Sequence, residues 1–237
     1  GTCAANLCTG LICNQPLPEC SAERSCTGTG CDCLYPLTVG SIGIFCQEPA
    51  IRGWKASDPG VVETVIPDHP PNQNGGQFIL AAKARNVVVG CLWEYEYALY
   101  NMNSDRSAAG FRVALPTDLS EADLQDIRDT AGFHDLDYHS GEIWAGTDWL
   151  PATVAPGSIS WATPDATNPN ANALRWGTLY NFRFQANRPP EPSTVTIDLF
   201  KPGTPPNVTG VSVAPGASSV GACCPDVTCT LKPELCC

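Results

Sequence analysis

The densest group of side chains able to bind a metal lies in one short run near the middle of the chain. Asp135, Asp137 and His139 alternate with other residues, and Glu142 follows them. In an extended strand, residues at i, i+2 and i+4 project from one face, so two carboxylates and an imidazole would lie together. Such ligands suit calcium and, less well, zinc. The alternative is that these polar groups satisfy backbone donors of the following loop. We prefer this alternative, which assigns the chain no metal and no cofactor.

A second arrangement able to do chemistry is the carboxylate pair Glu94 and Glu96. Two residues apart on a strand, their Cα atoms are separated by about 6.6 to 7 Å. This spacing is compatible with the paired carboxylates of glycoside hydrolases. Any strand of alternating polarity produces the same pattern, however, and we favour the interpretation that both side chains lie on a solvated face.

Patterns typical of other enzyme classes are missing from the sequence. It contains no G-x-S-x-G nucleophile turn, no G-x-G-x-x-G and no phosphate-binding P-loop. Only His69, His134 and His139 could serve as a histidine base. We therefore expect a protein that is not an enzyme, and a hydrolase built on the two glutamates is our third hypothesis.

The cysteines indicate an oxidising compartment. The chain has 14 of them, an even number, and no pair shows C-x-x-C spacing, which argues against a zinc ribbon. We expect all of them to form disulfides, as in secreted or cell-surface proteins. They are concentrated at the two ends of the chain: Cys3, Cys8, Cys13, Cys20, Cys26, Cys31, Cys33, Cys46, Cys91, Cys223, Cys224, Cys229, Cys236 and Cys237.

Charge and hydropathy narrow the range of partners. The net charge of −11 repels nucleic-acid phosphates and anionic lipids, and no apolar run reaches the ~18 residues that a membrane span needs. The chain starts at Gly1 without an initiator methionine, which we interpret as a mature, processed form. The triplet Asn207-Val208-Thr209 matches an N-glycosylation sequon.

Short apolar runs separated by glycine, proline and asparagine predict an all-β protein. The strongest strand signal is Asn86–Tyr100, where aromatic residues alternate with Glu94 and Glu96, so the aromatic side chains should face inward. We expect Phe111–Leu115 to pair with this strand as a hairpin across a polar turn. The other expected strands are Val61–Ile66, Gln77–Ala82, Phe133–Tyr138, Ser158–Ala162, Leu174–Gln185 and Thr194–Phe200.

One short helix is expected, because Ser120 to Asp123 resembles a capping box and Gly132 is a stop signal. The fold class is therefore a jelly-roll or immunoglobulin-like β-sandwich with one short helix and disulfide-rich termini. We divide the chain into a cysteine-rich N-terminal segment at 1–33, a sandwich at 34–205, and a linker with a cysteine-rich tail at 206–237.

Three blocks of sequence resemble a group of uncharacterised secreted β-sandwich proteins of planctomycete-type bacteria. They are Trp93–Ser107 (WEYEYALYNMNSDRS), Gly132–Glu142 (GFHDLDYHSGE) and Asn172–Phe184 (NALRWGTLYNFRF). The resemblance covers roughly residues 77 to 205. It implies a jelly-roll or immunoglobulin-like sandwich, and similar proteins look like subunits of extracellular fibrils joined by donor-strand exchange. It implies no enzymatic activity.

These observations lead to one main hypothesis and one alternative. The main hypothesis is a structural subunit of an extracellular bacterial filament, whose partners are copies of itself and also glycans. Leu7, Leu11 and Ile12 are the main apolar groups of the N-terminal segment, and Leu7 and Leu11 would project from one side of a donated strand. Val208–Val213 is the competing donor. The alternative is a monomeric adhesin or carbohydrate-binding module.

Overall fold

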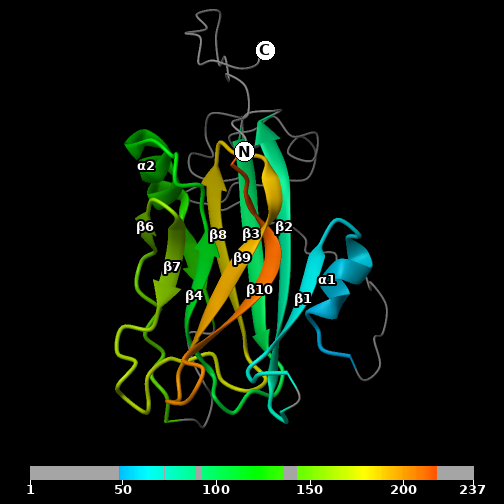
Figure 1. Ribbon diagram of the computed structural model, residues 1–237, viewed down its shortest axis with the longest axis vertical. Helices are drawn as coiled ribbons and strands as arrows, with labels where there is room; N and C mark the ends of the chain where they lie inside the picture. Colours follow the sequence, from blue (N-terminus) through cyan, green and yellow to red (C-terminus); the bar gives the residue numbers. More distant parts are fainter. Residues whose placement is uncertain (1–47, 72, 89–91, 136–142, 218–237) are drawn as a thin grey trace, which may run out of the picture. The chain divides into compact units, whose positions relative to one another are not determined.

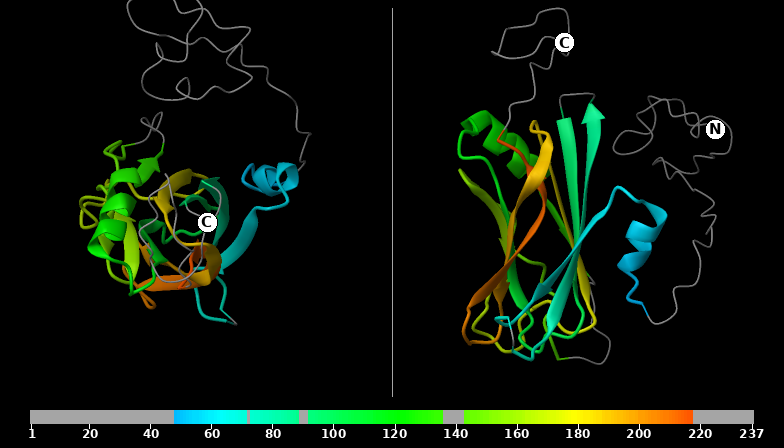
Figure 2. Two further views of the ribbon diagram at one scale, coloured as in Figure 1. Left: turned by 90° about the horizontal axis from the view of Figure 1, so that it is seen from above. Right: turned by 45° about the vertical axis from the view of Figure 1, so that its right-hand side comes forward.

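A computed structural model describes residues 48–71, 73–88, 92–135 and 143–217. The described residues belong to one compact unit, in which ten antiparallel strands form two five-stranded sheets. Figure 1 and the right-hand view of Figure 2 show these sheets as two layers facing each other. The expected all-β sandwich is confirmed.

Strand order differs from sequence order in both sheets. The first sheet runs β1-β2-β3-β8-β5, with β1 (Val62–Pro67), β2 (Gln77–Val88), β3 (Leu92–Asn101), β8 (Leu179–Ala186) and β5 (Gly132–His134). The second runs β10-β9-β4-β7-β6, with β10 (Asn207–Pro215), β9 (Pro190–Leu199), β4 (Ala108–Ala114), β7 (Ser158–Ala162) and β6 (Thr153–Ala155). β3 is thus the central strand of the first sheet and β4 that of the second.

Aromatic side chains from both sheets fill the space between them. On β3, Tyr95 and Tyr97 are fully buried and Trp93 is partly buried against the core, while Glu96 is exposed. The inward orientation predicted for the aromatic residues of this strand is confirmed. Phe182 of β8 lies at the centre, and its ring centroid is 4.7 to 5.6 Å from those of four other rings: Phe111, Phe133, Trp149 and Trp161.

Within the described residues two helices accompany the sheets, one more than expected. Helix α2 (Glu121–Thr130) begins with the predicted capping box, in which Ser120 and Asp123 bond each other's backbone N–H groups. Helix α1 (Arg52–Ser57) was not expected. It has no side-chain cap at Ile51, and its six residues are too few to show a helical period.

The expected hairpin between β3 and Phe111–Leu115 is wrong. β3 pairs with β2 and β8, whereas β4 belongs to the other sheet and pairs with β7 and β9. The chain thus crosses between layers after Asn101. A hairpin within one sheet and a connection that crosses to the other sheet both join two strands of alternating polarity through a polar turn. The sequence pattern is therefore the same for both. The apolar stretch expected as one strand, Asn86–Tyr100, is also divided between β2 and β3.

Residues beyond 205 also contribute to the sandwich. β10 pairs with β9 along its whole length, from Asn207 opposite Asp198 to Pro215 opposite Pro190. The two sheets approach each other where β10 meets β1, because a Cβ atom at Gly210 would lie only 2.7 Å from Cδ1 of Ile66. The described sandwich therefore extends to Pro215.

Buried tyrosines predict a loss of stability in alkali. Desolvation raises the pKa of Tyr95, Tyr97 and Tyr180 far above the ordinary value. In the unfolded chain these phenols ionise near pH 10, so the folded state holds the protons more tightly. Their contribution to stability is complete below about pH 10 and decreases as the pH rises further. We expect circular dichroism and tyrosinate absorbance to change together above about pH 10. Ionisation of these phenols in a chain that stays folded would contradict this prediction.

Candidate functional site

The outer face of the first sheet has an apolar part and a polar part. Helix α1 covers the apolar part, where Ile51 and partly buried Trp54 pack against Ile79, Ala81 and Ala98 of β2 and β3. The polar part lies beside it, over β3, β8 and β5. α1 therefore leaves the polar part of this face open.

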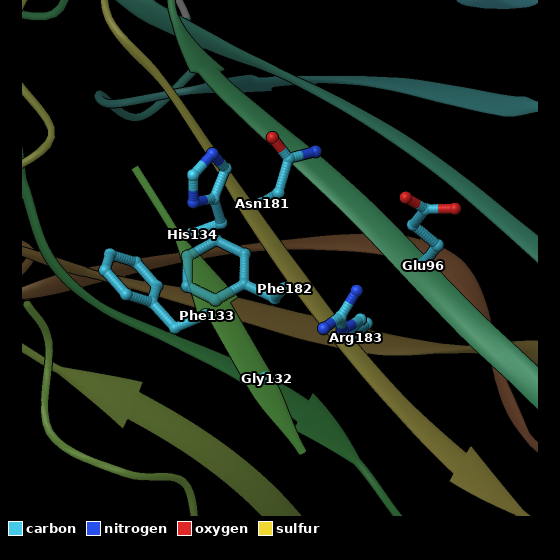
Figure 3. A pocket seen from close by; sticks show the side chains of 7 residues that line it. All are labelled: Glu96, Gly132, Phe133, His134, Asn181, Phe182 and Arg183. Carbon is cyan, nitrogen blue, oxygen red and sulfur yellow. The ribbon is translucent and has the colours of Figure 1, made fainter. Parts of the chain in front are cut away.

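Register places four polar side chains next to one another on this open part. Glu96 is opposite Arg183, which is opposite Gly132, and Asn181 is opposite His134 in the next outward-facing row. Neighbouring strands are about 4.8 Å apart and successive outward residues about 6.6 to 7 Å apart. Figure 3 shows Glu96 on one strand, Asn181 and Arg183 on the next, and His134 on the third.

These residues line a pocket with a volume of about 410 Å³. Its floor is formed by Phe133 and Phe182, whose rings pack in the core. Gly132 leaves the space into which Arg183 extends, because a Cβ atom at this position would be 2.9 Å from Nε of Arg183. The pocket therefore depends on a glycine in the short edge strand β5.

The polar groups of this pocket have no partner among the residues that the structure describes. No hydrogen bond or ion pair joins the side chains of Glu96, His134, Asn181 or Arg183 to another described residue. Their donors and acceptors are therefore available to a ligand. We call this set the polar pocket.

An adjacent pocket of about 330 Å³ shares Glu96 and is lined on its far side by Trp54. Apart from Glu96, its charged groups are paired with one another. Lys83 bonds Asp58, which lowers the pKa of that carboxyl, and Arg85 bonds Glu94, which raises the pKa of the guanidinium. The two glutamates singled out in the sequence thus differ: Glu94 is bonded to Arg85, whereas Glu96 feels the charge of Arg85 but makes no hydrogen bond or ion pair with a described residue.

The run proposed as a metal site is only partly described. β5 ends at His134, and Asp135 is buried and accepts a hydrogen bond of 2.5 Å from Nδ2 of Asn172. This bond fits the architectural role that we preferred for the run. Asp137, His139 and Glu142 lie outside the described residues, and the described residues contain no cluster of metal-binding side chains.

Asn172 connects this run to the core. Its side chain also donates to the carbonyl of Thr147 at 2.9 Å and accepts from the Tyr180 hydroxyl, and its own carbonyl accepts from Nε1 of Trp149 at 2.7 Å. Asn172 lies at the centre of this network. Its three side-chain neighbours, Asp135, Trp149 and Tyr180, are all buried. The network fixes the loop after β5 to strand β8.

The remaining predicted residues are placed as follows. Leu7, Leu11, Ile12 and all 14 cysteines lie outside the described residues. Asn207 is the first residue of β10 and is exposed. Sequence reasoning missed Asn181 and Arg183 as site residues and did not associate His134 with Glu96. Only strand register brings them together, and no local sequence signal reports register between strands so far apart.

Comparison with protein-family models, curated proteins and solved structures found no match to this chain. None of the helices in the described residues is long and apolar enough to cross a membrane. The function must therefore be argued from the sandwich itself.

Proposed function

We propose that the protein is a structural subunit of an extracellular bacterial filament that assembles by strand addition. The observation that carries the proposal is an unpaired strand edge. β1 pairs with β2 only from Gln77 to Ala82, and no described strand pairs with that side of β2 from Lys83 to Val88. Figure 1 shows β2 continuing well past the end of β1.

The free edge of β2 has the properties that a strand acceptor needs. An edge with unpaired N–H and C=O groups binds an extended segment through main-chain hydrogen bonds. Apolar groups accompany it: Val87 and Val88 are 45% and 50% exposed, and Ala84 and Trp93 are partly buried against the core. A β-bulge between Asn86 and Val88 interrupts the regular register there. The acceptor edge is therefore in regular register from Lys83 to Asn86 and continues past the bulge to Val87 and Val88.

The N-terminal segment, residues 1–33, is the donor that we favour. Leu7 and Leu11 have the spacing of one strand face, and they span five residues, close to the length of the acceptor edge. The competing donor, Val208–Val213, is already paired with β9 within its own sandwich. A donor from one subunit and an acceptor on the next form a head-to-tail contact, which continues as a filament. Disulfides would then stabilise the junctions.

Electron microscopy of the full chain and of truncated chains tests this proposal. We expect the full chain to form regular filaments, deletion of residues 1–30 to abolish them, and deletion of residues 222–237 to have a smaller effect. Val87→Lys should reduce assembly strongly, because it places a charge among the exposed valines at the edge of β2, which a donated strand would cover. Val211→Lys is the matched control, since Val211 is also exposed but lies on β10.

Filaments that persist after deletion of residues 1–30 would exclude the N-terminal donor. Equal effects of the two lysine substitutions would exclude β2 as the specific acceptor. Discrete single particles from the intact chain under oxidising conditions would contradict the proposal and favour the monomeric adhesin.

A further inference from the structure

We propose that the polar pocket formed by Glu96, His134, Asn181 and Arg183 binds a neutral glycan. This inference is independent of filament assembly, because the pocket lies on the sheet face and the acceptor edge is formed by β2. It rests on three observations: the mixture of donors and acceptors, their lack of protein partners, and the space over Gly132 and Phe182.

The chemistry of the four side chains matches neighbouring sugar hydroxyls. A hydroxyl can donate to the Glu96 carboxylate and accept from the Arg183 guanidinium, and these residues lie on adjacent strands. Hydrogen bonds to charged groups are stronger than those between neutral groups. Asn181 offers both a donor and an acceptor, and His134 adds one of either kind. A polyol satisfies all these groups, whereas an apolar ligand would leave them unpaired.

Charge favours a neutral ligand over an acidic one. The pocket contains one carboxylate and one guanidinium, so an added carboxylate or sulfate would meet both attraction and repulsion. At longer range, the net charge of −11 opposes the approach of any anion. The same field has no effect on an uncharged sugar.

Size and surroundings indicate a short segment of a glycan chain. The volume of about 410 Å³ is at the lower end of the range for small-molecule sites. Glu96 also lines the neighbouring pocket, which Trp54 borders. A chain that leaves the polar pocket past Glu96 would therefore reach an indole, and aromatic rings offer an apolar surface to sugars.

Binding of the full-length protein to immobilised oligosaccharides tests the inference. The neutral probes are cello-, manno- and xylo-oligosaccharides, and oligogalacturonate is the acidic comparison. We expect retention of at least one neutral probe and none of oligogalacturonate. Glu96→Gln and Arg183→Ala should each weaken binding at least about tenfold, since each removes a charge-assisted hydrogen bond.

Glu191→Gln is the matched control, because it makes the same chemical change at an exposed residue of β9 in the other sheet, and Glu191 lines neither pocket. It should change binding less than about twofold, a free-energy difference well below that of one hydrogen bond. Melting temperatures of all variants report whether the sandwich is intact. Failure of the wild type to bind any neutral probe, preference for oligogalacturonate, or unchanged binding in both Glu96→Gln and Arg183→Ala would overturn the inference.

Discussion

Replacing Phe182 by alanine should destabilise the sandwich by about 3 to 5 kcal/mol, the usual cost of removing a buried phenylalanine ring. Phe182 is fully buried, and the nearest ring, that of Phe111 in the other sheet, has its centroid 4.7 Å away. The rigid neighbouring rings would not collapse into the space left behind, so a cavity would remain between the two layers.

Thermal unfolding followed by circular dichroism measures this effect. We expect the melting temperature of Phe182→Ala to fall by about 6 to 20 °C, given about 2 to 4 °C per kcal/mol for a domain of this size. Arg183→Ala is the control, because the next residue on the same strand is exposed on the opposite face. Its effect should stay within about 0.5 kcal/mol. Similar losses for both variants would mean that β8 faces the other way.

Asn172→Ala should be the second most damaging substitution, at about 2 to 4 kcal/mol. The amide of Asn172 bonds the Asp135 carboxylate, the carbonyl of Thr147 and the hydroxyl of Tyr180. Removing it leaves several buried polar groups with fewer partners, and each such group costs about 1 to 3 kcal/mol. The carboxylate is the most costly of them because it is charged.

Urea unfolding of Asn172→Ala beside Asn168→Ala provides the measurement. Asn168 is exposed, and its side chain accepts one hydrogen bond, from the backbone N–H of Asn170 at 2.9 Å. Its loss should cost no more than about 1 kcal/mol. A smaller effect at Asn172 than at Asn168 would contradict the role of Asn172 as the connection between the loop and β8.

Elements whose boundaries are marked by a nearby glycine or capping residue were predicted well from the sequence. β7 has the predicted bounds, because Ile159 and Trp161 alternate with polar residues directly after Gly157, whose φ of 92° favours glycine. The start of α2 was predicted from Ser120 and Asp123, whose side chains form the cap. In both elements the signal lies within a few residues of the boundary that it determines.

Features that depend on distant residues were not predicted. The pattern around β4 does not reveal which sheet it joins, because Phe111 and Val113 flank the polar Arg112 in the same way in either arrangement. The candidate site also depends on residues far apart in the sequence. Glu96 was noticed within its own strand, but Arg183 and His134 become its neighbours only through the strand order β3-β8-β5. The order in which strands pair is a property of the whole chain, so a short stretch of sequence does not predict it.

The strand order also determines when the sandwich can close. The central strands β3 and β4 precede their partners β8 and β9 by a long stretch of chain, since Trp93 is opposite Ala186 and Ala108 is opposite Leu199. Closing such long loops costs entropy before any contact forms, so all-β sandwiches typically fold in milliseconds to seconds. A nascent chain would keep the inner faces of β3 and β4 open to water until β9 has been synthesised. The interval before β9 is available is therefore the period in which this protein is most prone to aggregate.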